Sequence, residues 1–354
     1  MITDIRLQQF RSYMDDSFEF SPGVNIIVGP NGSGKTNLLE ALLVVSRGSS
    51  YRAKDVDLVA FHKDWARVDV HAGDAVRSMK LVVTPAVSKT YEIDSKVYRR
   101  LPLHHTTPIV LFEPNHLMLL SGFPDLRRSY LDDLLEQMHP GFGTTRRAYR
   151  RALAQRNALL KKEGTSSRQE MFPWDVRLSE LGGTIARHRA ELVEHINQSL
   201  PTLYANISKA KDDVMMVYHA RHPVASYESA MLNKLEADMT LDAQRGFTGT
   251  GPHREDFGVL FNGRPADEVA SRGELRTAVL CLKIVELSLL EEVRDQKPLL
   301  LLDDVFSELD GARRHALTDY LKDYQTFITT TDADVVLQHF TDDCRIIPLT
   351  TIGK

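Results

Sequence analysis

The residues of this 354-residue chain best suited to chemistry form one short run, Gly29-Pro30-Asn31-Gly32-Ser33-Gly34-Lys35-Thr36. The run has the spacing G-x-x-x-x-G-K-[ST], in which glycines allow backbone N–H groups to surround phosphate oxygens. Lys35 can reach the β- and γ-phosphates, and the Thr36 hydroxyl can ligate Mg²⁺. The run therefore predicts a site for a nucleoside triphosphate, with Asn37 next to it at the start of a helix.

A phosphate loop requires a strand before it and a helix after it. Residues 24–28 are apolar enough for a short buried strand, and residues 37–45 form an apolar-rich helical segment. The alternative is a glycine-rich turn that merely precedes a helix. The strand–loop–helix context favours the nucleotide site.

A second set of reactive groups follows the apolar run 298–302, where Asp303 and Asp304 stand together. A continuous apolar run that ends in acid is typical of a central parallel strand. We expect Asp303 to hold Mg²⁺ through water and Asp304 to orient or activate the attacking water. Together with Lys35 these are the predicted catalytic residues. The alternative is a pair of acids that only end a strand.

The run Ser271-Arg272-Gly273-Glu274 has two explanations. Ser followed three residues later by Glu is a capping box, and a periodic apolar helix follows it. The second explanation is the pattern of ABC-type ATPase heads. In that pattern an S-x-G helix start precedes the strand that ends in acid, here 298–302, and Ser307-Glu308-Leu309-Asp310 follows that strand. In that class Ser271, Gly273, Glu274 and Asp310 would contact ATP held by a second copy. A helix N-terminus suits a γ-phosphate because its N–H groups are unpaired.

Composition limits the class of protein. With 42% hydrophobic residues the chain can bury a sizeable core in two lobes. The net charge of −4 gives no overall basic character but permits a local basic groove. Two cysteines without metal-type spacing indicate reduced thiols, and neither a signal peptide nor a membrane span is evident. We expect a cytoplasmic protein that does not contact a membrane.

The order of patterns predicts an α/β fold with an inserted helical lobe. Residues 1–120 contain the phosphate loop and an alternating stretch, 66–101, that predicts an antiparallel meander. Residues 121–245 are mainly helical, and residues 246–354 return to α/β texture. We expect the two ends to share one phosphate-loop sheet, as in an ABC-type ATPase head.

The inserted lobe predicts three helices, over 125–137, 144–163 and 174–200, the last ending before Pro201. A stripe of apolar residues near heptad spacing is compatible with both a core-facing side and a coiled-coil seam of the last helix: Leu178, Leu181, Ile185, Leu192 and Ile196. A helix of roughly 25 residues spans only about 40 Å, so we expect a short coiled-coil-like hairpin.

Arginines on the second of these helices are candidates for DNA phosphates, because such contacts need only positive charge. They repeat with helical spacing: Arg146, Arg147, Arg150 and Arg151. The alternative is a solvated face balanced by nearby acids. Arg99-Arg100 and Arg127-Arg128 are further candidates, and the last pair could instead bind acids inside the lobe.

Residues 249–256 have a comparable ambiguity. They could form a plain turn into the strand 257–261, or they could bring His253 and Arg254 to nucleotide or DNA. We favour the structural role.

The chain resembles the RecF family of SMC-like ATPases. Beyond the general ATPase motifs, the landmarks that carry the resemblance run in order along nearly the whole chain: Phe10-Arg11-Ser12-Tyr13, 29–40, Phe112-Glu113-Pro114, Gly122-Phe123-Pro124, Arg127-Arg128, 250–256, 271–283, 301–310 and 328–331. The resemblance implies an ATP-dependent homodimer that binds duplex DNA beside a single-stranded gap. It also implies weak, DNA-stimulated ATPase activity, and action with RecO and RecR in loading RecA.

Two departures from the wider ABC pattern predict slow hydrolysis. The usual Glu after the metal-binding acid is the shorter Asp304, and no switch His follows the strand 326–331. We expect turnover of about 1 s⁻¹ or less. Glu113 is the candidate for the Q-loop. The alternatives are another SMC-like ATPase head, or a scaffold that uses ATP only as a dimerisation ligand.

Overall fold

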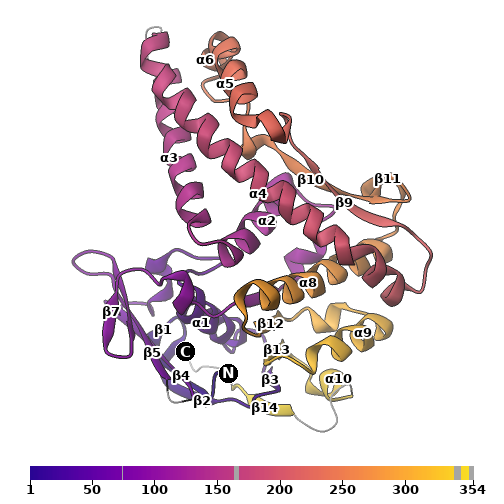
Figure 1. Cartoon of the computed structure of the whole chain (residues 1–354). Coiled ribbons are helices and arrows are strands. Elements are labelled where there is room, and N and C mark those ends of the chain that lie inside the picture. Colours follow the sequence, from indigo (N-terminus) through magenta and orange to yellow (C-terminus); the bar gives the residue numbers. More distant parts are fainter. Residues whose placement is uncertain (74, 163–166, 339–343, 351–354) are drawn as a thin grey trace. The chain divides into compact units, whose positions relative to one another are not determined.

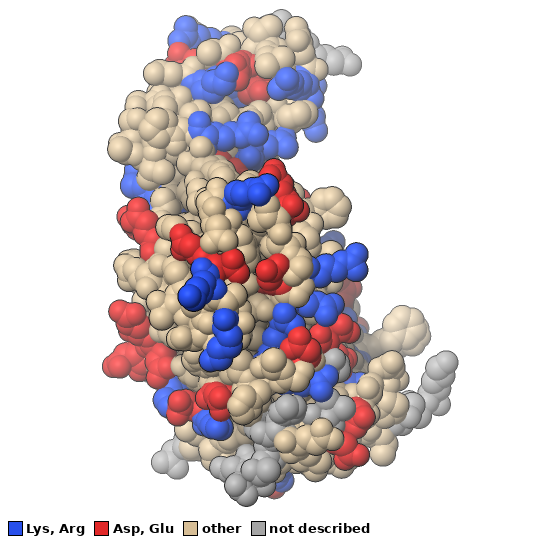
Figure 2. Space-filling view, turned by 90° about the vertical axis from the view of Figure 1, so that its right-hand side faces the viewer, with Lys and Arg blue, Asp and Glu red and all other residues tan. Residues whose placement is uncertain are grey.

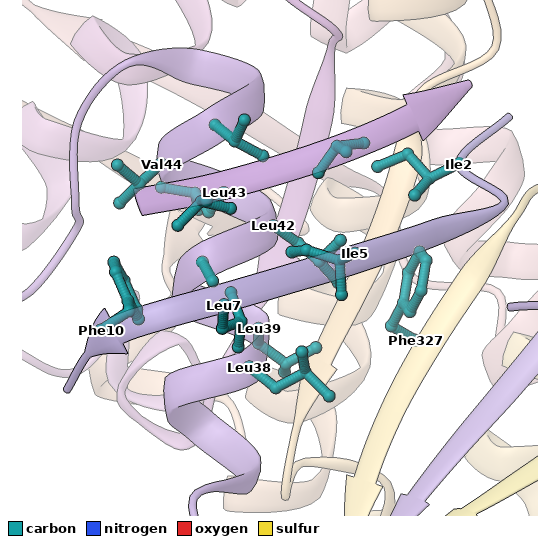
Figure 3. Close-up of a cluster of buried hydrophobic side chains, with 14 of the residues drawn as sticks. Ile2, Ile5, Leu7, Phe10, Leu38, Leu39, Leu42, Leu43, Val44 and Phe327 are labelled. Carbon is teal, nitrogen blue, oxygen red and sulfur yellow. The ribbon is translucent and has the colours of Figure 1, made fainter. Parts of the chain in front are cut away.

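The helix that follows the phosphate loop is enclosed between two β-sheets. In the computed structural model, which describes residues 1–73, 75–162, 167–338 and 344–350 (backbone only at 307 and 335), this helix is α1 (Lys35–Arg47). Its apolar side chains, including Leu38, Leu42 and Val44, pack among residues of both sheets (Figure 3). A helix that is apolar on nearly every side requires such a two-sided cover.

One of these sheets is parallel and has five strands. Its order is β14 (Cys344–Pro348), β3 (Val24–Val28), β13 (Thr326–Thr330), β12 (Leu299–Asp303) and β8 (Ile109–Phe112). The two ends of the chain thus share one sheet, as predicted. Because all five strands run the same way, their carboxyl ends meet at one edge, where the phosphate loop and Asp303 follow their strands.

The second sheet is antiparallel and has six strands. Its order is β2 (Tyr13–Glu19), β1 (Asp4–Phe10), β4 (Trp65–Ala72), β5 (Ala75–Val82), β6 (Ser88–Ile93) and β7 (Lys96–Tyr98). The predicted meander over 66–101 is confirmed. It continues into the first hairpin of the chain, since β1 pairs with β4 through Ile5↔Val70 and Leu7↔Val68.

By packing, the described residues form two compact units. The sheet unit comprises Met1–His116 and Glu286–Lys354, and the helical unit comprises Leu117–Val285. The predicted domains are 1–120, 121–245 and 246–354, the last as the C-terminal part of the ATPase lobe. The packing places the second boundary elsewhere, because residues 246–285 group with the helical unit.

The helical unit contains the predicted helices and a small sheet. Its helices are α2 (Pro124–Met138), α3 (Phe142–Leu160), α4 (Arg168–Ser208), α5 (Tyr227–Ala237), α6 (Met239–Arg245) and α7 (Ala266–Val269). Its sheet has the order β11 (Arg264–Pro265), β10 (Asp256–Phe261), β9 (Val214–His219). Helices α3 and α4 run side by side as a hairpin (Figure 1).

Three further helices complete the chain. Helix α8 (Arg272–Arg294) precedes β12, and its residues 272–285 group with the helical unit and 286–294 with the sheet unit. Helices α9 (Gly311–Leu321) and α10 (Ala333–Leu337) flank β13 along the chain. Within the described residues, no helix combines the length and apolar composition needed to cross a bilayer.

The predicted end of the third helix before Pro201 is wrong. Helix α4 has 41 residues and contains both Pro173 and Pro201, so it is about 60 Å long. A proline inside a helix costs about 3 kcal/mol because one backbone hydrogen bond is lost. Burial offsets that cost: Leu200 and Tyr204, on either side of Pro201, are fully buried. The stripe from Leu178 to Ile196 faces the core as predicted.

A buried arginine joins the helices of the hairpin to α6. Arg156 on α3 is fully buried and donates to Asp175 on α4 at 2.6 Å and to Asp242 on α6 at 2.7 Å. It also donates to the Thr248 hydroxyl at 2.9 Å. Burial raises the pKa of Asp175, and Arg156 opposes that shift. The positive charge of the Arg156 guanidinium thus stabilises the charge of two buried carboxylates.

We expect Arg156→Ala to destabilise the helical unit by about 3–5 kcal/mol, because it strands two buried carboxylates. Urea unfolding followed by the fluorescence of Trp174 on α4, in a Trp65→Phe background, measures this loss. The control is Arg177→Ala, which removes an exposed pair with Glu180 and should cost less than about 1 kcal/mol. Equal losses in both variants would contradict the role of Arg156.

Candidate nucleotide site

The phosphate loop has a backbone that only glycine adopts easily. Gly32 and Gly34 have φ values of +83° and +97°, in the left-handed region. A Cβ at Gly34 would lie 2.9 Å from the Tyr13 hydroxyl, and a Cβ at Gly29 would lie 2.6 Å from the Leu349 carbonyl oxygen. Gly29 and Gly34 therefore have no room for a side chain, whereas Gly32 has open space and is required by its left-handed backbone alone.

Polar groups inside the loop suit a phosphate. Lys35 Nζ donates to the carbonyl oxygens of Gly29 at 2.9 Å and Pro30 at 3.2 Å, which holds the ammonium across the loop. The hydroxyl of Ser33 is buried and has no hydrogen-bond partner in the part of the chain that the structure describes. Phosphate oxygens would satisfy such groups. The residues present fit the triphosphate of ATP.

The two predicted Mg²⁺ ligands lie in contact. The Thr36 hydroxyl donates to Asp303 Oδ1 at 3.0 Å, and the Thr329 hydroxyl donates to the same oxygen at 2.8 Å. The Tyr51 hydroxyl donates to the other oxygen, Oδ2, at 3.3 Å. Hydroxyl and carboxylate oxygens beside a phosphate loop are the donors that Mg²⁺ prefers, so this set fits the ion.

The main chain of Asp304 has a left-handed conformation and is held by a hydrogen bond. Its φ is +53°, and its N–H donates to the Thr329 hydroxyl at 2.9 Å. Burial raises the pKa of its carboxyl, with Lys35 opposing the shift and Asp303 adding to it. A partly buried carboxylate near Lys35 and Asp303 has the chemistry of a base that accepts a proton from water.

The first hairpin braces the loop, which the sequence did not reveal. The Tyr13 hydroxyl donates to the Gly34 carbonyl oxygen at 3.0 Å, and Asn37 donates through its side-chain amide to the Ser12 hydroxyl at 2.8 Å. The run Phe10-Arg11-Ser12-Tyr13 was a family landmark without an assigned role. These contacts give it one, since they position the start of α1.

A buried carboxylate in α1 was also missed. Glu40 is fully buried and accepts hydrogen bonds from Arg11 at 2.8 Å, Arg52 at 2.9 Å and the Ser50 hydroxyl at 2.5 Å. These donors outweigh burial and lower its pKa. An acid within an apolar helix was the available signal, because such a charge requires partners.

Glu113 follows β8 beside the same edge. The pairing Phe112↔Leu302 places it opposite Asp303, and Asp303 and Glu113 both contribute to raising the pKa of Tyr51. This placement brings Glu113 toward Asp303, the predicted Mg²⁺ ligand. Its assignment to the Q-loop stays a prediction.

A pocket of about 660 Å³ opens beside the start of α1. It is lined by Arg11, Ser12, Asn37 and a turn that carries Phe61 and His62, whose rings lie 4.0 Å apart. Because it adjoins the helix that follows the phosphate loop and has exposed aromatic rings, this pocket has the room and the chemistry for a nucleoside.

The predicted signature segment is a capped helix start. Ser271 N–H donates to Glu274 Oε2 at 2.6 Å, and Glu274 N–H donates to Ser271 Oγ at 3.3 Å. Asp310 likewise caps α9, since it accepts from the Arg313 N–H at 3.0 Å. The capping explanation is therefore confirmed for Ser271. Contacts of Ser271, Gly273, Glu274 and Asp310 with ATP on a second copy stay predictions.

The arginine candidates for DNA divide into two groups. Arg146 is only 13% exposed and pairs with Asp132, Asp133 and Glu136, so its charge is used within the protein. Its neighbours on α3 are exposed, and their DNA role stays a prediction: Arg147, Arg150 and Arg151. Arg99 and Arg100 are exposed on the sheet unit.

Arg127 and Arg128 are structural, the alternative left open above. Arg127 makes two bonds to Asp256, at 2.8 and 2.7 Å, and Arg128 donates to the Glu255 carbonyl oxygen at 2.8 Å. Arg127 thus ties α2 to the first residue of β10, and Arg128 ties it to the residue before that strand. The segment 249–256 is a structural turn for most of its length, as favoured.

His253 and Glu255 show this most clearly. Burial lowers the pKa of His253 to about 4, and its ring bonds the Tyr149 hydroxyl at 2.7 Å. Glu255 is buried and accepts from the Tyr227 hydroxyl at 2.6 Å and the Arg221 N–H at 2.9 Å. Neither side chain is available to nucleotide or DNA.

Comparison with known proteins agrees with this geometry. Residues 1–347 match the RecF/RecN/SMC N terminal domain. The chain is 35% identical over 344 residues to the DNA replication and repair protein RecF of Heliobacterium modesticaldum, covering 93% of this chain and 92% of that protein. It is 31% identical over 352 residues to the RecF of Lachnoclostridium phytofermentans, covering 98% and 97%.

Solved structures give the same result. The recombination mediator protein RecF-ATPrS in the RecFOR pathway superposes with a TM-score of 0.88 at 31% identity, covering 99% of this chain and 97% of that one. An Smc head domain from Pyrococcus furiosus has a TM-score of 0.50 at 16% identity over 96% and 91%, and shows the fold alone. The predicted fold class, an ABC-type ATPase head with an inserted helical lobe, is confirmed.

We expect Tyr51→Phe to weaken the Mg²⁺ dependence of nucleotide binding, because it removes one hydrogen bond that orients Asp303. The Mg²⁺ concentration that gives half of the full ATP affinity should rise about fivefold, the equivalent of about 1 kcal/mol. Affinity in EDTA should stay unchanged. Calorimetric titration of ATP across a Mg²⁺ series measures both quantities.

The control is Tyr324→Phe, which removes a 2.7 Å bond to Glu291 at the opposite edge of the parallel sheet. An affinity loss for Tyr51→Phe that is the same with and without Mg²⁺ would mean that the hydroxyl does not act through Asp303.

Proposed function

The chain belongs to the RecF family, and from this premise we propose that it is an ATP-dependent DNA-binding recombination mediator. In this proposal the protein dimerises around ATP at gapped or duplex–single-strand junction DNA in the cytoplasm. With RecO and RecR it promotes the loading of RecA. The contact between Thr36 and Asp303 carries the nucleotide part of the proposal, because it joins the phosphate loop to the acid-ended strand.

The residues of the site have separate tasks in a slow ATPase. Lys35 and the loop N–H groups would hold the β- and γ-phosphates. Thr36 and Asp303 would hold Mg²⁺, which when bound would supply neutralising charge at the phosphoryl oxygens. Asp304 orients the attacking water and accepts its proton. Hydrolysis at about 1 s⁻¹ or less then acts as a timer for release of the dimer.

Closure around ATP uses a second copy of the chain. The exposed N-terminus of α8, with Ser271 as its cap, offers N–H groups to the γ-phosphate of the other copy. ADP lacks that phosphate, so it does not complete the contact. Each dimer therefore contains two composite sites.

We expect the solution mass to double in ATP–Mg²⁺ and to stay that of one chain in ADP–Mg²⁺, as measured by light scattering. Ser271→Arg should abolish the doubling while the ATP affinity of one chain stays within about twofold, because its bulk blocks only the contact with the other copy. Ser271→Thr, which keeps the cap, is the control.

A wild-type protein that stays monomeric in both nucleotides would remove the ATP-gated dimer from the proposal. If Ser271→Arg loses ATP binding instead, the residue acts only as a helix cap within its own chain.

We expect Asp304→Asn to bind ATP normally but to hydrolyse it at least about 10²-fold more slowly, because the amide cannot accept a proton. Asn tolerates the left-handed backbone of Asp304, so the fold should not change. Single-turnover phosphate release, with light scattering to follow the lifetime of the dimer, measures the effect.

Normal release by Asp304→Asn would assign the water to another residue. The alternative function is a scaffold that uses ATP only as a dimerisation ligand, and the short Asp304 side chain favours it. A scaffold predicts no phosphate release from the DNA-bound dimer of the wild type. The same assay therefore separates the two functions.

A further inference from the structure

We propose that four exposed cations of the helical unit, Lys161, Arg221, Arg245 and Arg254, form a surface that binds the phosphate backbone of DNA. We call these four residues the basic rim. The inference rests on the proposed DNA-binding function and assigns a surface to it. None of the four belongs to the nucleotide site. Two of them were already candidates for DNA from the sequence: Arg254, in the segment 249–256, and Lys161, at the end of the arginine-rich helix.

The basic rim is contiguous because its four residues lie in or beside one segment, residues 245–254, which joins α6 to β10. Arg245 and Arg254 belong to the segment, and Lys161 and Arg221 lie beside it. Arg221 donates to the carbonyl oxygens of Gly249 at 3.4 Å and Arg254 at 3.2 Å. Arg245 Nη1 lies 3.7 Å from the position of a Cβ at Gly249. The side chain of Lys161 lies 3.5 Å from the position of a Cβ at Gly246. This short segment, which carries Arg245 and Arg254 at its ends, is thus joined by cations from two other parts of the chain, Lys161 and Arg221.

The nearest acids along the chain, Asp242 before the segment and Glu255 after it, are buried. Asp242 is 1% exposed and accepts from Arg156 and from the Gly249 N–H at 3.0 Å. Glu255 is also 1% exposed and is bound by tyrosine hydroxyls. Among the residues that the structure describes, no carboxylate pairs with any member of the basic rim. Its positive charges are therefore available to a polyanion.

An exposed aromatic ring lies within the rim. Phe247 is 39% exposed, and the guanidinium of Arg254 lies 4.7 Å from its ring centroid. Stacking on the ring restricts Arg254 to few orientations, so less entropy is lost when it binds a phosphate through two N–H groups. Aromatic rings among cations are typical of surfaces that bind nucleic acid backbones and bases.

Helix α3 extends the rim. Asn157 on α3 accepts from the Thr248 N–H at 2.8 Å, so this face of the helix borders the segment. Arg150 lies two turns earlier on the same face, is exposed, and has no ion pair within the described residues. Figure 2 shows Lys and Arg side chains gathered toward the end of the helical unit where Figure 1 labels α5 and α6.

Recognition by the rim would not depend on sequence. Lys and Arg contacts to phosphates release counterions, so each contact adds nearly one unit to the slope of log affinity against log salt. Duplex and single-stranded segments both present phosphates, which suits a protein that acts at a junction between them.

The test uses a double variant of the rim, Arg245→Gln with Arg254→Gln. The control is a second double variant, Lys211→Gln with Arg264→Gln, which removes the same charge from exposed positions elsewhere in the helical unit. Fluorescence anisotropy with a gapped duplex in ATP–Mg²⁺, between about 50 and 200 mM salt, gives affinity and salt slope. We expect the rim variant to bind at least about tenfold more weakly, with a slope smaller by about two, while the control changes little. ATP-dependent doubling of mass reports that the rim variant is folded.

Unchanged affinity and slope for the rim variant would overturn the rim while leaving DNA binding by the protein intact. An equal loss in the control would also overturn it, because the effect would then be one of total charge. Absence of binding by the wild type would contradict the proposed function itself.

Discussion

The hydroxyl of Thr36 and the carboxylate of Asp303 are 267 residues apart in the chain and 3.0 Å apart in the structure. This contact exists because β3, β13 and β12 are consecutive neighbours in one parallel sheet, so that their carboxyl ends share an edge. Parallel neighbours require long crossover connections, and the helical unit lies within one of them. The helical unit is inserted in the crossover from β8 to β12.

Enclosure of α1 makes the phosphate loop rigid. The helix is covered by both sheets, and its one buried acid, Glu40, binds arginines from the first hairpin and from the segment after the helix. A buried charge without partners is costly, so this arrangement favours a single position of the helix. The phosphate-loop residues at its N-terminus therefore depend on contacts more than a turn away.

Local patterns predicted the phosphate loop, the strands β3, β12 and β13 and the cap at Ser271, because each depends on residues close together in the chain. The edge strand β8 was not predicted. Pairings between distant segments were not predictable from the sequence. Tyr51 reaches Asp303, and Arg146 binds the acids of α2, only once the fold brings them together. The helix end predicted before Pro201 is wrong for the same reason. Burial of the residues next to Pro201 outweighs the local tendency of proline to end a helix.

The left-handed backbone of Asp304 bears on how this ATPase could evolve. Asp is among the few non-glycine residues that adopt φ near +53° without a large penalty, and Glu is less tolerant of it. A mutation to the longer acid, the usual residue of the wider ABC pattern, would bring its own conformational strain. Acceptance of Glu would then require the turn after β12 to be remodelled, so the shape of the main chain limits which acid can follow Asp303.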